Sequence, residues 1–217
     1  VKRNYVAGVS VSLNYARYRV LRPILKVYNK FLISKSTNVP WMSPAAIAIF
    51  DSVLSKEMSG FEFGSGRSTR FFAHRIKSLV SLEHDDKWFH QVSNQLKAQS
   101  VSNIDYHLIE PDETDKPILI KKRWDDFTVG PVAATCYERY HSFIHRFPDE
   151  SFDFIVVDGR ARTECSMASI PKLKSGGFLV LDNAERLRYQ PIHTKLSTWK
   201  KVYTTTGLTY TIFWFKP

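Results

Sequence analysis

Short apolar runs alternate with longer segments of helical periodicity along most of the chain. The runs that indicate β-strands are 59–63, 79–82, 104–109, 152–157 and 178–181. Because strands that alternate with helices form parallel βαβ units, this pattern predicts an α/β domain with a mostly parallel sheet. Two alternating segments, 199–203 and 209–215, flank Thr206-Gly207 and predict a closing antiparallel hairpin. The expected sheet therefore has seven strands.

Helix-start signals accompany the segments of helical periodicity. Ser43 is a favourable N-cap residue, and Pro44 after it has the backbone angle of the first helical position. A helix that runs through Leu54 is therefore expected. Asp85 is placed to cap a helix over 86–98. Two more helices are expected over 137–147 and 162–173, and a turn is expected over 175–177.

The N-terminal segment differs from the rest of the chain. From Ser10 to Ile33, apolar and aromatic residues recur three and four positions apart with basic residues between them, which predicts amphipathic helices with Pro23 as the dividing point. The net charge is +10, and residues 1–50 hold eight Lys or Arg and no Asp or Glu. This basic block suits contact of residues 1–35 with nucleic acid or with an anionic membrane. The alternative is a solvated basic helix at the edge of the domain. The expected division is a basic helical extension over 1–40 and one domain over 41–217.

Cysteine content and hydropathy narrow the class of protein. The two cysteines, Cys136 and Cys165, cannot build a disulfide framework and lack the CxxC spacing of a metal site. No apolar run approaches the roughly 18 residues of a membrane span. The first residues also lack the apolar core of a signal peptide. These features favour a cytoplasmic protein that contacts a membrane, if at all, only peripherally.

A glycine loop, Gly64-Ser-Gly66, follows the first strand and carries the first chemical signal. Glycine allows a sharp turn, and a helix that begins near Ser68 directs unpaired N–H groups at whatever occupies the loop. The second strand ends in Glu83, 19 residues beyond Gly64, where a doubly wound fold places the acid that binds a ribose diol. A dinucleotide-binding loop would carry a third glycine where this chain has Thr69, which argues against a nicotinamide ligand.

Polar residues also follow the other expected parallel strands. They are Glu110, Asp158, Asp182 and Asn183. The C-terminal edge of an open α/β sheet is where ligands bind, so these side chains are expected at the same edge as the glycine loop.

In this order and spacing, the loop 62–66, Glu83, 156–158 and 174–182 resemble the class I S-adenosylmethionine-dependent methyltransferases over residues 41–217. The resemblance implies a Rossmann-like fold and S-adenosyl-L-methionine as the cofactor. The residues that it implies for cofactor binding are Glu62, Gly64, Ser65, Gly66, Ser68, Glu83, His84 and Asp158. Among them, Glu83 would hold the ribose hydroxyls, His84 would border the adenosine, and Glu62 would brace the loop or the cofactor amine.

Asp158 with the adjacent Asp182-Asn183 is similar to the metal site of the catechol O-methyltransferase group. Three oxygen ligands at neighbouring strand ends suit a hard ion such as Mg²⁺, which would draw a substrate hydroxyl toward its ionised form. This chain differs from that group at one position. The group has a lysine that acts as a base three residues after the first aspartate, and this chain has Ala161 there. The alternative is a structural Asp-Asn turn at a strand end.

Basic side chains near these aspartates complete the candidates. Arg160 and Arg162 cannot act as bases, but they suit bidentate contact with an anionic substrate. His141 and His145 lie four residues apart on the predicted helix and, like Asp158, are candidates for the catalytic base. The alternative for the two histidines is a place on an ordinary helix surface.

The sequence thus predicts a methyltransferase that methylates an oxygen of a small or anionic metabolite, sugar or lipid, with Mg²⁺ assistance as an option. A nucleic-acid methyltransferase with a basic N-terminal arm is one alternative, although the Asn/Asp-Pro-Pro-aromatic signature of amino-group methylation is absent after Asp158. The other is a module that binds the cofactor without catalysis and docks on a membrane or partner.

Overall fold

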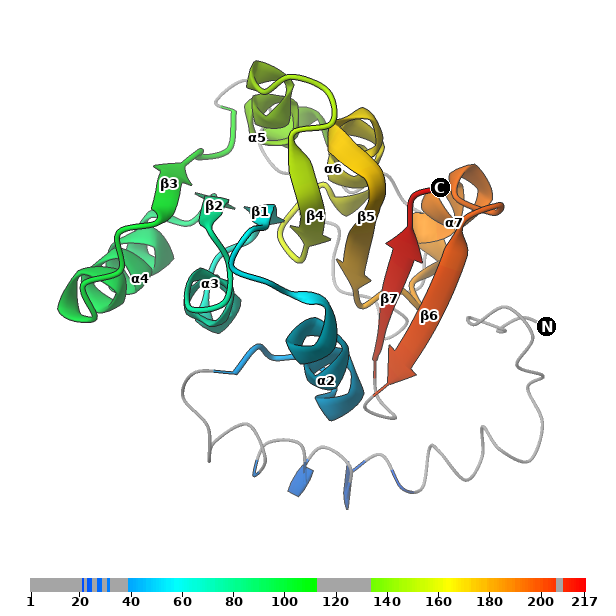
Figure 1. Cartoon of the computed structure of the whole chain (residues 1–217), viewed down its shortest axis with the longest axis horizontal. Coiled ribbons are helices and arrows are strands. Elements are labelled where there is room, and N and C mark those ends of the chain that lie inside the picture. Colours follow the sequence, from blue (N-terminus) through cyan, green and yellow to red (C-terminus); the bar gives the residue numbers. More distant parts are fainter. Residues whose placement is uncertain are drawn as a thin grey trace.

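A twisted β-sheet forms the centre of the computed structural model, which describes residues 39–112, 134–205 and 209–217 and, before them, positions 21, 23, 24, 27, 28 and 31. Within these residues the sheet has seven strands in the order β3-β2-β1-β4-β5-β7-β6 (Figure 1). The strands are β1 (Ser59–Phe63), β2 (Ser78–Glu83), β3 (Ile104–Leu108), β4 (Phe152–Val157), β5 (Leu173–Asp182), β6 (Lys200–Thr205) and β7 (Tyr210–Phe215). The first five strands pair in parallel, and β7 is antiparallel to β5 and β6. The predicted Rossmann-like sheet with its closing hairpin is confirmed.

Helices lie on both faces of the sheet (Figure 1). They are α2 (Pro44–Val53), α3 (Arg67–Ala73), α4 (Asp86–Ala98), α5 (Glu138–Ser142), α6 (Arg162–Ser169) and α7 (Gln190–Lys195). Residues of α2 and α3 share one hydrophobic cluster, and residues of α5, α6 and α7 share another. Successive strand side chains point to opposite faces, so Phe154 of β4 joins the first cluster and Ile155 joins the second. The central strand β4 is therefore buried on both sides, which explains its nearly continuous apolar sequence.

The predicted helix caps are present. The Ser43 hydroxyl accepts a hydrogen bond from the Ala46 backbone N–H (3.1 Å) at the start of α2. The Asp85 carboxylate accepts one from the Trp88 backbone N–H (2.8 Å) at the start of α4. Each cap satisfies a donor that would otherwise lack a partner in the first helical turn, so these local signals were enough to place both helix starts.

The helix predicted over 137–147 is present, but its winding changes along the segment. This region consists of a 3₁₀ segment (Ala134–Tyr137), the short helix α5 and a second 3₁₀ segment (Phe143–Arg146). The changes in winding bury Tyr140, Phe143 and Ile144 against the sheet. His141 is on α5 and His145 is on the second 3₁₀ segment, so the two histidines do not share one regular helix face.

The expected turn at 175–177 lies inside a strand. β5 begins at Leu173, directly after a 3₁₀ segment (Ile170–Lys172) that ends the predicted helix over 162–173 early. The register of β5 against β4 shifts between Phe152 and Phe154, and Gly176 has φ +77°, a left-handed value that favours glycine. The glycines therefore form an irregularity of the kind seen at β-bulges, and the strand continues through it.

Most of the predicted basic extension over 1–40 lies outside the described residues, as does Thr206-Gly207 of the hairpin. The six described positions between 21 and 31 are helical. In the described parts of the chain, no helix is both long and apolar enough to cross a lipid bilayer. The division at residue 40 stays a prediction.

The strand order reverses beside β1. From β1 the chain passes through α3 to β2 on one side, whereas β4 pairs with β1 on the other side. The two crossovers leave in opposite directions and open a crevice at the C-terminal ends of these strands, which is where open α/β sheets bind their ligands.

Candidate functional site

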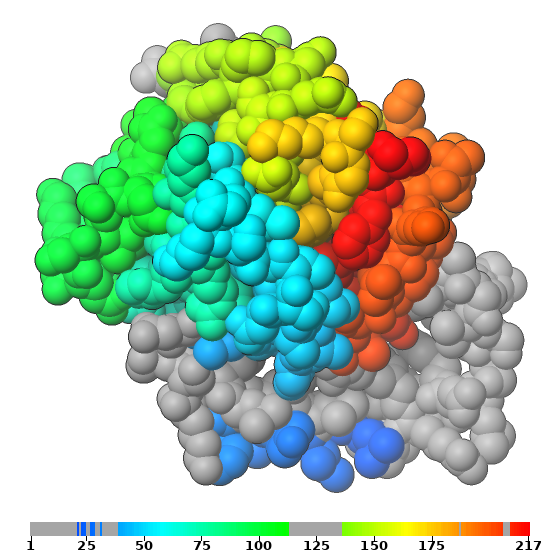
Figure 2. Space-filling model, viewed as in Figure 1, coloured from blue at the N-terminus to red at the C-terminus, as the bar shows by residue number. Residues whose placement is uncertain are grey.

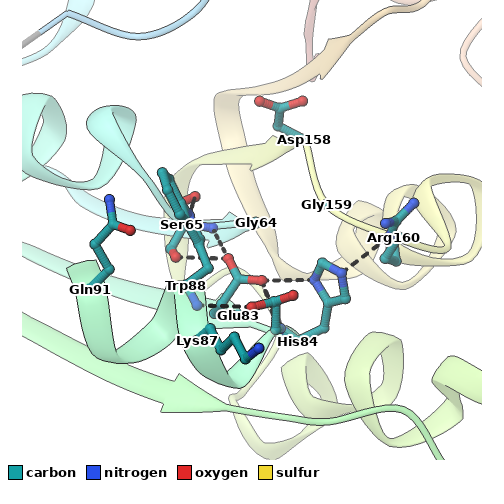
Figure 3. A pocket seen from close by; sticks show the side chains of 11 residues that line it. Gly64, Ser65, Glu83, His84, Lys87, Trp88, Gln91, Asp158, Gly159 and Arg160 are labelled. Atoms are coloured by element: carbon teal, nitrogen blue, oxygen red, sulfur yellow. Dashed lines mark hydrogen bonds and ion pairs between the residues drawn. The ribbon is translucent and has the colours of Figure 1, made fainter. Parts of the chain in front are cut away.

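A cavity of about 490 Å³ lies at the C-terminal ends of β1, β2 and β4 (Figure 3). Its lining comes from three strand ends and the first turns of α4. The lining residues are Gly64, Ser65, Glu83, His84, Asp85, Lys87, Trp88, Gln91, Asp158, Gly159 and Arg160. Gly64, Ser65, Glu83, His84, Asp158 and Arg160 were predicted site residues, and the fold brings these six together.

The glycine loop and the loop after β4 are in close contact. Gly64 has φ +95°, and a Cβ atom at this position would lie 2.6 Å from the backbone N of Gly159. Gly66 has an extended φ, and a Cβ atom there would meet only the Trp88 ring at 3.7 Å. The backbone thus requires glycine at 64 but not at 66.

Glu83 is the acid at the floor of the cavity, and its side chain is only 3% exposed. Its Oε2 accepts hydrogen bonds from the Ser65 hydroxyl (2.8 Å) and backbone N–H (3.2 Å). Its Oε1 accepts from the backbone N–H groups of His84 (2.7 Å) and Asp85 (3.0 Å). Burial raises the pKa of Glu83, but the hydrogen bonds from His84, Asp85 and Ser65 together outweigh it, so the pKa is lowered and the carboxylate stays ionised.

His84 connects Glu83 to the opposite wall of the cavity (Figure 3). Its Nδ1 lies 2.8 Å from Glu83 Oε1, and its Nε2 lies 3.1 Å from Nε of Arg160. Because a guanidinium only donates, Nε2 is the acceptor, which places the proton of a neutral His84 on Nδ1 facing Glu83. A carboxylate–imidazole–guanidinium series thus runs from the end of β2 to the loop after β4.

Glu62 lies beneath the loop, is fully buried and does not line the cavity. Its Oε2 accepts hydrogen bonds from the hydroxyls of Thr69 (2.6 Å) and Ser81 (2.7 Å). Burial raises the pKa of Glu62 to about 7. Thr69 in turn accepts a hydrogen bond from the Gly66 backbone N–H (2.8 Å), so Glu62 braces the loop through Thr69. Ser68, also predicted for cofactor binding, is buried beside this group and is absent from the cavity lining.

Trp88 is a cavity residue that the sequence reasoning missed. Its Nε1–H donates a hydrogen bond to the Ser65 carbonyl (2.9 Å), and its ring lies over Gly66. The available signal was a tryptophan in the first turn of α4, immediately after the strand that ends in Glu83. Its indole fixes the outer side of the loop and presents an aromatic surface to the cavity.

The two predicted metal-binding aspartates are both engaged by Arg162. The Arg162 Nη2 lies 2.7 Å from Asp158 Oδ1 and donates to the Asp158 carbonyl oxygen (2.6 Å). Its Nη1 donates to the Asp182 carbonyl oxygen, and its Nε donates to that of Gly159 (3.0 Å). Asp182 Oδ1 accepts from the Thr211 hydroxyl (2.6 Å). A buried guanidinium therefore joins the ends of β4 and β5.

Solved structures with a similar fold come from diverse organisms. A methyltransferase-like protein from Silicibacter pomeroyi is 19% identical, with a TM-score of 0.58 over 83% of this chain and 89% of that chain. An S-adenosylmethionine-dependent O-methyltransferase from Thermotoga maritima is 11% identical, with a TM-score of 0.54 over 86% and 69% of the two chains. A tRNA methyltransferase from Aquifex aeolicus is 12% identical, with a TM-score of 0.52 over 84% and 71%. The chain has the class I methyltransferase fold. No protein-family model and no curated protein matches the sequence.

Within the class I methyltransferase fold, the donor set at the ends of β4 and β5 does not fit a divalent metal. Burial raises the pKa of Asp182 to about 7, the Asp158 charge adds to the rise, and Arg162 opposes it. Asn183 has φ +53°, and its side-chain oxygen accepts a hydrogen bond from Arg186 (3.3 Å). Guanidinium groups thus already engage a carboxylate oxygen of Asp158 and the side-chain oxygen of Asn183, and the Thr211 hydroxyl engages Asp182 Oδ1. Among the described residues, no group of three or more His, Cys, Asp or Glu side chains is arranged to hold a metal ion.

The remaining predicted residues are two arginines, proposed for the substrate, and two histidines, proposed as the base. Arg160 is exposed at the cavity wall, and its role as a substrate contact stays a prediction. The Arg162 side chain is only 11% exposed and is committed to the strand ends, so it is not available to a substrate. His141 is half-buried, His145 is exposed, and neither lines the cavity. Asp158 is thus the one predicted base that reaches the cavity.

Proposed function

We propose that the chain binds S-adenosylmethionine in this cavity and catalyses methyl transfer to a hydroxyl group of a small anionic acceptor. The observation that carries the proposal is the ionised Glu83 carboxylate, which lines a cavity of about 490 Å³ beside the Gly64–Gly66 loop at the point where the strand order reverses. Ribose diols are bound by such an acid in doubly wound folds. The class I methyltransferase fold gives the same assignment by analogy.

Several side chains of the site suit the parts of this ligand. Glu83 would accept hydrogen bonds from the ribose hydroxyls, in exchange for or alongside the bond from the Ser65 hydroxyl. Trp88 offers an aromatic surface on the α4 side of the cavity. The Gly64 backbone can approach a ligand closely because no side chain intervenes.

The acceptor half of the reaction would depend on the loop after β4. When bound, S-adenosylmethionine supplies a sulfonium methyl group, and the protein must hold the acceptor oxygen in line with it. Asp158 lines the cavity and would take the hydroxyl proton, while Arg160 would bind an anionic group of the acceptor. The proposed step includes no metal ion, because Arg162 rather than a metal contacts the Asp158 carboxylate.

Calorimetric titration of the full chain with S-adenosylmethionine and S-adenosylhomocysteine tests the cofactor assignment. We expect one saturable site for each ligand. Glu83→Ala should weaken the binding of both ligands. Glu57→Ala, at an exposed position outside the cavity, should leave the binding unchanged. If neither ligand binds the intact chain, the proposal is wrong. Radiolabelled methyl transfer to a panel of neutral and anionic hydroxyl compounds then tests the acceptor class, and loss of anion preference in Arg160→Ala would support it.

A further inference from the structure

Arg162 occupies a place where a cation is required. It is the first residue of α6 and follows Ala161, which has a left-handed conformation with φ +44°. From there its guanidinium contacts oxygen atoms of Asp158, Gly159 and Asp182 at the ends of two neighbouring strands. These acceptors are one carboxylate, that of Asp158, and three backbone carbonyl oxygens, which are types of oxygen ligand that divalent ions bind.

The guanidinium suits this set better than a metal ion would in the observed arrangement. It is planar, permanently charged and carries five N–H donors, so it can satisfy several oxygens on different strands at once. Placing the half-buried Asp158 carboxylate beside the buried Asp182 carboxyl group without a neighbouring cation would leave their charge uncompensated. Arg186, which donates to Asn183, adds a second guanidinium beside the third predicted metal ligand.

We propose that Arg162 is a built-in replacement for a divalent cation: it joins the ends of β4 and β5 and holds Asp158 at the cavity. It is a positioning residue, because it acts on the acceptor through Asp158. The statement about Asp158 and the acceptor rests on the proposed function, whereas the replacement of a metal does not. The chain should therefore need no divalent ion for stability, cofactor binding or methyl transfer.

The test measures divalent-ion binding directly, without cofactor or acceptor, so its failure is distinguishable from failure of the proposed function. Thermal unfolding of the wild-type chain is followed with and without millimolar Mg²⁺, and Mn²⁺ binding is followed by electron paramagnetic resonance. We expect no shift in the wild-type melting temperature and no bound Mn²⁺. Arg162→Ala should melt at a lower temperature and gain a stabilising response to both ions. Adding Asp182→Asn to Arg162→Ala should abolish that gain, which a purely structural loss would not show.

A Mn²⁺ site in the wild-type chain that disappears in Asp182→Asn would overturn the proposal. So would an Arg162→Ala variant as stable as the wild type. If Arg162→Ala does not fold, the wild-type Mn²⁺ titration alone decides, and Arg162→Lys, which keeps a charge but cannot contact all the oxygens, should fold with lower stability and no ion response.

A different observation concerns the helical positions before residue 39. The side chains of Leu21, Ile24, Val27 and Tyr28 are 48%, 65%, 71% and 57% exposed. At about 100° per residue, these positions fall within one arc of a helix, so four large apolar side chains share one exposed face. Figure 2 shows the described positions of this segment, in blue, at the molecular surface.

Charge indicates what would cover this apolar face. The sequence interleaves Arg22, Lys26 and Lys30 with these apolar residues, and residues 1–50 contain no acidic residue. An apolar helix face with basic neighbours is typical of helices that lie in the interface of an anionic membrane. Nucleic acid would use the basic residues but would leave the aliphatic face uncovered. The combination therefore favours lipid.

We infer, independently of the proposed function, that this apolar face docks the chain on an anionic lipid surface. The full chain is co-sedimented with vesicles of phosphatidylcholine alone and of phosphatidylcholine mixed with phosphatidylglycerol. Binding should require phosphatidylglycerol and should fall at least about tenfold in the double variant Ile24→Ser/Val27→Ser. The matched control is Val202→Ser/Tyr203→Ser, which changes exposed apolar residues of β6 (42% and 37% exposed) and should bind like the wild type.

Two outcomes would overturn the lipid assignment. One is failure of the wild-type chain to bind mixed vesicles, including the case in which it binds a single-stranded RNA instead. The other is vesicle binding that Ile24→Ser/Val27→Ser leaves unchanged, which would mean that only the basic residues act.

Discussion

The Ser65 hydroxyl donates a 2.8 Å hydrogen bond to Glu83 Oε2, so the glycine loop and the acid of the second strand are directly joined. The same hydroxyl is 2.6 Å from the Tyr106 hydroxyl on β3. The carboxylate that would bind a ribose is thus held by the protein's own donors. A ligand hydroxyl must share Oε2 with Ser65 or replace it, which gives the two residues separable effects on binding.

Glu83→Ala should weaken S-adenosylhomocysteine binding by about 2 kcal/mol or more, about thirtyfold, because charge-assisted hydrogen bonds to a buried carboxylate are lost. Ser65→Ala should bind at least as tightly as the wild type, because it removes the group that competes for Oε2. Calorimetry of both variants, with thermal unfolding to confirm folding, makes the comparison. Equal losses in the two variants would mean that Ser65 itself is the main ligand-binding group.

Gly64→Ala and Gly66→Ala form a matched pair for the loop backbone. Gly64 has φ +95° and lies against Gly159, so an added Cβ is both strained and in collision, and a loss of at least about 2 kcal/mol in the free energy of unfolding is expected. Gly66 has an extended φ and open space up to the Trp88 ring, so its change should stay below about 1 kcal/mol. Urea unfolding of both variants without ligand measures the difference. Similar losses at both positions would contradict the close contact of the two loops.

The order of residues along the chain was sufficient to predict the sheet and most of the cavity. Strand ends of a parallel sheet meet at one edge, so Gly64, Glu83 and Asp158 could be placed together from sequence alone. The role of Arg162 could not be predicted from the sequence, because it depends on the turn at Ala161, which directs the Arg162 side chain back to two strand ends. The interruption of the helix after Ser142 was hidden for a similar reason, since tertiary packing of Phe143 and Ile144 sets the local winding there. Local signals predict elements, whereas side-chain direction at loops is set by packing that no local pattern records.

Glu62 should make stability depend on pH near neutrality. Burial raises its pKa from 4.5 to about 7, so between these values the folded state binds more protons than the unfolded state. The contribution of Glu62 is therefore fully present below about pH 4.5 and is lost as the pH rises through 7, by up to about 3 kcal/mol. Urea unfolding of Glu62→Gln from about pH 5 to about pH 8 should show a smaller decline than the wild type. Glu57→Gln, at an exposed position, is the control and should follow the wild type. An unchanged slope in Glu62→Gln would show that other groups cause the decline.

Thr69 stands where a dinucleotide-binding loop carries its third glycine, and its hydroxyl has two bonds that glycine could not make. It accepts from the Gly66 N–H and donates to Glu62, so it connects the loop backbone to a buried carboxyl group. Thr69→Val keeps the shape but leaves a backbone donor and a carboxyl oxygen without this partner, which should cost about 1–3 kcal/mol of stability. Because the loop would then lose its brace, S-adenosylhomocysteine affinity should fall as well. Thr69→Ser keeps the hydroxyl and should retain both properties to within about 1 kcal/mol. Urea unfolding and calorimetry on the two variants distinguish the effect of the hydroxyl from that of the methyl group. If Thr69→Ser loses as much stability and affinity as Thr69→Val, packing of the methyl group holds the loop, and the bridge to Glu62 does not.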